Sequence, residues 1–202
     1  MELTTRQRRA RAGWLLGGAA ALVGAAGLGH LAGRDGGLLR VAQVLDHPLL
    51  FGALAFVAAV AGIGVAIRNG IVRGLVIGAA VLATIAAAPI ALLVVMGSFT
   101  VDTLDEAAPG RTDRRLVVTE GADMIDPLWW VYVDTGSGLG VRRWQLGAFN
   151  GDDPANGLVE VRWDGPDRVR VVTGDGPDLK THIVELDRDG RPLRSLTMGA
   201  VD

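Results

Sequence analysis

The sequence predicts a membrane α-helical region of three transmembrane helices, followed by a small all-β antiparallel meander domain that forms a sandwich or an open barrel. Two observations lead to this fold class. Long apolar runs without acidic or basic side chains fill most of the first half of the 202-residue chain. In the second half the hydrophobic period falls to two, and Gly, Pro, Asn and Asp separate the apolar stretches, which is typical of strands joined by hairpin turns.

Charge divides the chain at the same place as hydropathy. Residues 1–97 carry eight Arg against three acidic residues, whereas residues 98–202 carry twelve basic residues against nineteen acidic ones. The acidic β-domain argues against a nucleic-acid partner, because phosphate backbones bind to basic surfaces. The chain contains no Cys, which excludes disulfides, thiolate metal sites and a Cys nucleophile.

Three apolar segments have the length of a transmembrane helix: residues 13–32, 48–67 and 74–97. The last would extend roughly 36 Å as a helix, enough to cross a hydrocarbon core of about 30 Å. The sequence therefore predicts a membrane region over residues 13–97 whose partner is the lipid bilayer. In the first span small residues recur at every fourth position from Gly13, which predicts a face for close helix packing.

Two short connectors separate the spans. Residues 33–47 are amphipathic at helical period, so they either lie as a helix in the membrane interface or continue into the next span. Residues 68–73 are too few for anything but a turn, and Asn69-Gly70 supplies the left-handed geometry that such a turn needs. The second and third spans are therefore expected to form an antiparallel helical hairpin.

The distribution of arginine predicts the orientation in a cell (plasma) membrane. The tail, residues 1–12, carries four Arg and the 68–73 connector carries two, against two in the connector on the other side. Cytoplasmic loops are enriched in basic residues, so the tail is expected in the cytoplasm and the C-terminal domain outside it. The basic tail and first apolar run also fit a cleaved signal peptide, which would leave the C-terminal domain on the same side.

Residues 98–112 are acidic and predicted to be a linker, with strand character near residues 99–101, and residues 113–202 are the predicted extracytoplasmic β-domain. Trp144 and Trp163 are expected in its core. Turn residues separate candidate strands at 116–119, 128–134, 141–148, 158–163, 168–173, 181–186 and 193–198. Short connections of this kind favour antiparallel hairpins.

Three Ala/Gly-rich spans precede a domain that contains WDGPDRVRVV, residues 163–172, and HIVELDRDGRPL, residues 182–193. In this layout the chain resembles uncharacterised small integral membrane proteins of actinobacteria. The resemblance extends over the layout of the whole chain. It implies the same membrane-plus-β architecture and brings no activity and no functional residues.

Two adjacent tryptophans mark a candidate partner or ligand surface. In a strand, Trp129 and Trp130 point to opposite faces, so one enters the core while the other is exposed or covered by a loop, a partner or the bilayer interface. Arg142 and Arg143 lie in the next candidate strand and could add an anion or partner patch. A solvated strand face explains the two arginines more simply.

Three polar residues near the predicted outer ends of the first two spans form a second candidate cluster. His30 lies near the end of the first span, and Asp46 and His47 precede the second. These residue types can carry a proton or ligate a metal, but no ligand-spacing motif supports a metal site. Interfacial polar residues at helix ends explain them more simply, and neither a metal nor a cofactor is expected.

The sequence contains no G-x-S-x-G, H-E-x-x-H, P-loop or dinucleotide motif, so the chain is not expected to be an enzyme. Its spans have no acidic or basic side chain away from their ends, which argues against a transporter. The favoured function is presentation of the β-domain to a membrane or cell-envelope protein partner. One alternative is a ligand sensor that uses a pocket at Trp129 and Trp130 and acts through a partner. The other is a membrane-anchored hydrolase in which two carboxylates, or Ser137 and His182, would converge.

Overall fold

The structure is a computed structural model and describes residues 4–97, 100–123, 126–152, 154 and 156–196. Its residues form two compact units. The helical unit contains the chain up to Ala32 together with Val41–Val94, and the β unit contains Gly33–Arg40 together with the chain from Val95 onward. The chain therefore passes between the units three times, because a short segment between the first two long helices belongs to the β unit.

Three helices are long and apolar enough to cross a membrane: α1 (Thr5–Ala32), α3 (Pro48–Ala66) and α4 (Gly70–Gly97). The three expected helices are therefore confirmed by length and composition. A short helix, α2 (Leu39–Leu45), lies between α1 and α3. Pro48 begins α3, where its fixed φ suits the first turn and its missing N–H costs no hydrogen bond.

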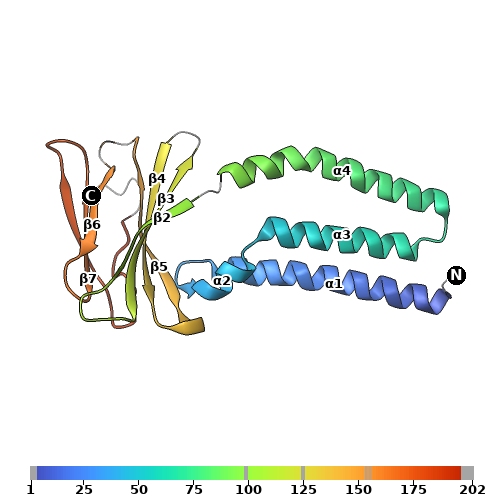
Figure 1. Ribbon diagram of the computed structural model, residues 1–202, viewed down its shortest axis with the longest axis horizontal. Coiled ribbons are helices and arrows are strands. Elements are labelled where there is room, and N and C mark those ends of the chain that lie inside the picture. Colours follow the sequence, from blue (N-terminus) through green and yellow to red (C-terminus); the bar gives the residue numbers. More distant parts are fainter. Residues whose placement is uncertain (1–3, 98–99, 124–125, 153, 155, 197–202) are drawn as a thin grey trace. The chain divides into compact units, whose positions relative to one another are not determined.

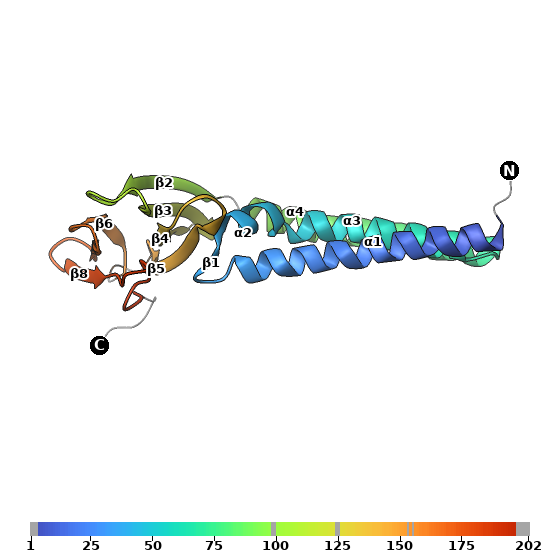
Figure 2. The same ribbon diagram turned by 90° about the horizontal axis from the view of Figure 1, so that it is seen from below.

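Helices α1 and α3 lie side by side within the helical unit (Figures 1 and 2). Small buried residues form the contact, including Ala12 and Ala19, which are seven positions apart on α1. On α3, a Cβ built at Gly62 would lie 3.1 Å from Leu16 Cγ, so the glycine permits the close approach. The predicted stripe is exposed in its first half, at Gly13 and Gly17, but Gly29 is buried, and a Cβ there would overlap the backbone of Leu45.

Asn69 caps the start of α4. Its Oδ1 accepts hydrogen bonds from the backbone N–H groups of Ile71 at 2.9 Å and Val72 at 3.3 Å. The prediction of a left-handed Asn-Gly turn was wrong, because Gly70 is the first residue of the helix and lacks a positive φ. A side-chain cap satisfies the free N–H groups of the first turn and lets α4 begin four residues before the predicted span.

Two antiparallel sheets make up the β unit, with strand orders β1-β5-β4-β3-β2 and β6-β7-β8 (Figure 1). The strands are β1 (Gly37–Leu38), β2 (Thr100–Ala107), β3 (Arg114–Asp123), β4 (Asp126–Thr135), β5 (Arg142–Asn150), β6 (Leu158–Trp163), β7 (Arg168–Thr173) and β8 (Lys180–Glu185), with a 3₁₀ turn, η1 (Gly138–Gly140), before β5. Strands β2 to β5 pair in sequence order, as do β6 to β8. The predicted antiparallel meander is therefore confirmed.

The two sheets share one apolar core. The larger sheet contributes Leu116, Val118, Val131, Val133, Leu146 and Phe149, and the smaller sheet and the residue after it contribute Trp163, Val169, Val171, Val184 and Leu186. Each buried side chain of this size stabilises the fold by about 1.5–3 kcal/mol relative to exposure. Trp163 joins this core as predicted, whereas Trp144 is only half-buried and packs against Gly36.

Three connecting segments differ from their predictions. Residues 98–112 are not simply a linker, because β2 occupies most of them and pairs with β3. Residues 33–47 do not form one interfacial helix, because they include β1 as well as α2. The last predicted strand, residues 193–198, makes only an isolated bridge at Leu196, and its residues 197–198 lie outside the described part of the chain.

Candidate binding surface on the larger sheet

Strand β4 divides its side chains between the two faces of the larger sheet. Val131 and Val133 are fully buried in the core, and Trp129, of the same parity, packs against that core. Trp130 and Tyr132 therefore lie on the opposite face, where each is half-buried. The structure thus places the two candidate tryptophans on different sides of the sheet.

Four residues form what we call the outer-face cluster: Trp130, Tyr132, Asp134 and Arg143. Arg143 lies opposite Asp134 in the neighbouring strand, and its Nε and Nη2 donate to the two carboxylate oxygens, each at 2.7 Å. The guanidinium also lies 4.9 Å from the centre of the Tyr132 ring. Such a bidentate pair fixes the position of the cation, and the aromatic ring adds a cation–π contact.

The titration behaviour of the cluster reflects its partial burial. Burial raises the pKa of Tyr132 and outweighs the nearby positive charge of Arg143, which lowers it. Burial by itself would lower the pKa of Arg143, but the hydrogen bond and charge of Asp134 raise it above its ordinary value. The phenol therefore remains neutral and the guanidinium remains charged at neutral pH.

Arg142 and Arg143 do not form one anion patch. Arg142 Nη1 donates to the backbone carbonyl of Gly36 at 2.8 Å, and the Gly36 N–H donates to the carbonyl of Arg143 at the same distance. The Leu39 N–H donates to the carbonyl of Val141 at 2.9 Å. The two arginines therefore have separate roles: one holds the edge segment that contains β1, and the other belongs to the outer-face cluster.

A polar cavity of about 320 Å³ lies elsewhere in the β unit, lined by Arg111, Arg114, Asp167, Leu186, Asp187 and Arg188. Arg114 is only 1% exposed, and its Nη1 pairs with Asp167 at 2.5 Å. Its Nη2 donates to the backbone carbonyls of Asp187 at 2.9 Å and Arg188 at 2.7 Å. This arginine connects the start of β3 to the turn between β6 and β7 and to the turn after β8. Neither Trp129 nor Trp130 lines its cavity.

Arg111 extends the same network at the surface. It pairs with Asp113 at 2.9 Å and with Asp167 at 3.1 Å, and its hydrogen bond lowers the pKa of the Asp113 carboxyl. Sequence reasoning missed this network. The only local signal was the position of Arg114, which precedes Leu116 and Val118 by even steps and therefore faces the core.

The polar cluster predicted at the span ends has exposed members. His30 lies in the last turn of α1 and is exposed, and Asp46 and His47, before α3, are exposed too. The His47 Nε2 lies 3.0 Å from the backbone oxygen of Gln43. Within the described ranges, no three His, Asp or Glu side chains are grouped so that they could hold a metal ion.

His182 lies on β8, and its Nε2 is 3.3 Å from the hydroxyl of Thr173. Partial burial lowers its pKa, and the positive charges of Arg194 and Lys180 lower it further. Ser137 is exposed and precedes η1 on the connection between β4 and β5. The contacts of His182 are those of a strand residue paired with its neighbour in the sheet.

No family model, curated protein or solved structure matches this chain. Its function must therefore be argued from the geometry of its surfaces. The outer-face cluster combines aromatic area with a fixed cation on paired strands, and these residue types are enriched at the energetic centres of binding surfaces.

Proposed function

We propose that this chain is an integral membrane protein of the cell membrane whose extracytoplasmic β unit binds a membrane or cell-envelope protein through the outer-face cluster. The observation that carries the proposal is that Trp130 and Tyr132 stay half-exposed beside the fixed guanidinium of Arg143. Trp, Tyr and Arg dominate the binding energy of protein interfaces. Their position on paired strands limits the entropy lost on binding, because little has to become ordered.

Polar pairs flank the cluster on the same face. The Thr119 hydroxyl donates to the Asp102 carboxylate at 2.7 Å, and Arg115 pairs with Asp105 at 2.6 Å. The Arg115–Asp105 pair is half-exposed and the charges of both members are compensated. An aromatic centre with a satisfied polar border is the usual anatomy of a protein interface.

The proposed orientation rests on where the arginines lie in the helical unit. The start of α1, with the arginines of the tail, and the connection between α3 and α4 lie at the same end (Figure 1). Arg68 and Arg73 flank that connection. Because cytoplasmic loops are enriched in basic residues, this end is expected to face the cytoplasm and the β unit is expected to lie outside.

Single cysteines test this orientation directly, because the natural chain has none. In intact cells, a membrane-impermeant maleimide should label the Ser137→Cys variant, whereas the Thr5→Cys variant should react only after lysis. Both positions are exposed in the structure, so their labelling depends on the side of the membrane. The reverse pattern would refute the orientation.

Partner binding is tested by purifying the tagged full chain from membranes in mild detergent with its associated proteins. Trp130→Ala should weaken capture of a specific partner by about 30-fold or more, which is the size of a hot-spot effect of about 2 kcal/mol. Val159→Ala, on an exposed strand position of the smaller sheet, is the control and should leave capture unchanged. A folded Trp130→Ala variant that captures the same proteins as the wild type would refute the proposal.

A further inference from the structure

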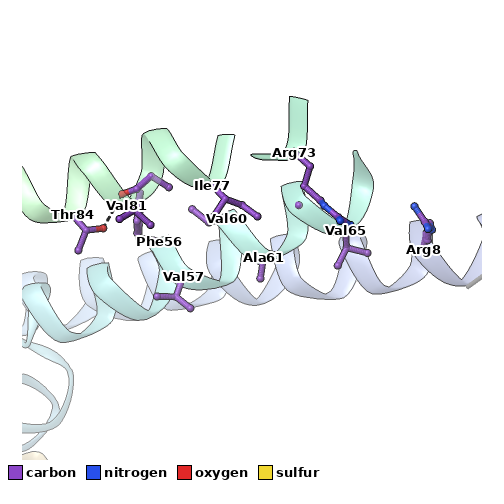
Figure 3. Close-up of a pocket in the computed structure, with 12 residues that line it drawn as sticks. Arg8, Phe56, Val57, Val60, Ala61, Val65, Arg73, Ile77, Val81 and Thr84 are labelled. Carbon is purple, nitrogen blue, oxygen red and sulfur yellow. Dashed lines mark hydrogen bonds between the residues drawn. The ribbon is translucent and has the colours of Figure 1, made fainter. Parts of the chain in front are cut away.

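An apolar groove runs between α3 and α4 within the helical unit (Figure 3). It consists of two adjoining cavities of about 640 and 510 Å³. Phe56, Val57 and Thr84 line both cavities, so the two are sections of one continuous space. None of the apolar window of α4 is buried in the described structure, which leaves this groove open along one wall.

Many of the residues that line the groove are Gly or Ala, which leave space between the two helices. Those on α3 are Gly52, Ala53, Ala61 and Gly64, and those on α4 are Ala80, Ala83, Ala87, Ala88 and Ala91. Small residues in facing helices normally let the backbones touch, as they do between α1 and α3. Between α3 and α4 they leave unfilled space lined by carbon atoms, and an apolar chain would fill it.

Two guanidinium groups from different helices lie at one end of this groove. Arg8 of α1 and Arg73 of α4 line the larger cavity at the end away from Thr84, where the Arg73 side chain reaches Val65 and Arg8 lies beyond it (Figure 3). Arg8 is half-buried, although its side chain is long and charged. In the described part of the chain, neither arginine is ion-paired with an acidic side chain, whereas every ion pair recorded lies in the β unit.

We propose that the groove binds an anionic phospholipid, with an acyl chain along α3 and α4 and the phosphate between Arg8 and Arg73. An apolar space that ends in two unpaired cations is complementary to an amphiphile with an anionic head. Guanidinium groups bind phosphate with two parallel hydrogen bonds, which favours arginine for this contact. The proposed orientation would place the lipid in the cytoplasmic leaflet, but the site itself does not depend on the β unit.

A transmembrane helix is a poorer occupant of the same space. A helix with its side chains is about 10 Å across and would have to continue past the interface. The connection between α3 and α4 is only residues 67–69, and it joins the two helices at the arginine end of the groove (Figure 1). A lipid tail is narrower and ends at its own head group, so it can enter from the membrane and stop at the arginines.

The test uses the full chain in mild detergent, titrated with phosphatidylglycerol or phosphatidylcholine while bound lipid is counted by native mass spectrometry. The wild type should bind phosphatidylglycerol more tightly than phosphatidylcholine. The Arg8→Gln/Arg73→Gln variant should bind it about 30-fold less tightly, as expected for the loss of two cationic contacts. The matched control, Arg9→Gln/Arg68→Gln, removes the same charge from exposed positions outside the groove and should bind like the wild type.

A second pair of variants tests the apolar part of the site without changing charge. Ala80→Leu places a larger side chain in the groove and should reduce binding of phosphatidylglycerol, whereas Ala79→Leu, one residue outside the lining, should not. Equal binding of the two lipids, equal effects of the two arginine pairs, or unchanged binding by folded Ala80→Leu would each overturn the proposal. Cross-linking of a second chain into the groove with no lipid retained would overturn it as well.

Discussion

The carboxylate of Asp35 accepts a hydrogen bond from the backbone N–H of Gln145 at 2.7 Å, across 110 positions of sequence. Asp35 follows α1, and Gln145 lies in β5. Together with the backbone bonds of Gly36 and Leu39, this contact adds β1 to the edge of the larger sheet. An edge strand with unpaired N–H and C=O groups invites unwanted pairing, so the segment between the first two long helices protects the β unit.

Asp35→Ala should lower the free energy of unfolding of the β unit by about 1 kcal/mol, because it removes a charged acceptor from a backbone N–H at an exposed edge. Thermal unfolding of the detergent-purified chain, followed by tryptophan fluorescence, measures this change. Asp175→Ala removes an exposed acid from a turn far from this edge and serves as the control. Equal unfolding temperatures for the two variants would show that the contact contributes nothing.

Gly36→Ala should be more destabilising than Gly110→Ala. Both glycines have positive φ, 73° and 71°, so alanine costs about 1–2 kcal/mol in backbone strain at either site. Only at Gly36 would the new Cβ clash, because it would lie 2.2 Å from Cζ3 of Trp144, whereas nothing lies within 4 Å at Gly110. The steric clash should add about 1–3 kcal/mol.

Comparing the unfolding temperatures of the two glycine variants separates steric clash from backbone strain. Gly36→Ala should also change the emission of Trp144, because the ring must move to make room. Equal destabilisation by the two substitutions would mean that the Trp144 ring moves aside without a measurable loss of stability.

Arg114→Leu should destabilise the β unit by about 3 kcal/mol, because it removes a buried charged donor from three acceptors. The Arg188 carbonyl loses its recorded donor, while Asp167 keeps Arg111 and the Asp187 carbonyl keeps the Gly190 N–H. Arg115→Gln should cost at most about 1 kcal/mol, since Arg115 forms a half-exposed pair with Asp105. The two residues are neighbours on opposite faces of β3. Chemical denaturation of the two variants therefore compares the loss of a buried arginine with the loss of a half-exposed one at almost the same place in the chain. A smaller effect at Arg114 than at Arg115 would contradict the assigned roles.

His182 should make the β unit less stable in mild acid. Its pKa in the folded protein is lowered, by burial first and by Arg194 and Lys180 second, so the unfolded chain binds the proton more tightly. The contribution to stability is therefore complete above the unfolded value of about 6.5 and is lost as pH falls through the folded pKa. His182→Gln should flatten the pH dependence of the unfolding temperature in this window, and an unchanged slope would exclude His182 as its source.

Local periodicity was enough to identify most elements. The strands at Leu158–Trp163 and Arg168–Thr173 have the predicted bounds, because apolar and charged residues alternate over residues 159–164 and 168–171. Most of strand β2 escaped prediction, which placed strand character only near residues 99–101, because its apolar signal is weak. Leu104 is its partly buried contact with the core, while Asp102 and Asp105 face the other side and resemble a solvated linker in sequence.

The candidate surface could be predicted only in part. The adjacency of Trp129 and Trp130 was sufficient to predict that they lie on opposite faces, because side chains alternate along any strand. Their sequence does not say which of them faces the core. That depends on the pairing of β4 with β3 and β5. The pairing with β5 also places Arg143 opposite Asp134 and leaves Arg142 to contact Gly36 at the edge.

The sequence by itself determined three apolar helices, an antiparallel β region and the segregation of basic and acidic charge, because hydropathy, period and charge are local properties of the chain. Tertiary structure decided that Gly33–Arg40 belongs to the β unit and that Arg114 is buried against Asp167 and the carbonyls of Asp187 and Arg188. It also decided that a groove remains between α3 and α4. These features depend on contacts between residues far apart in sequence, and a two-residue strand or a single buried arginine leaves no periodic signal.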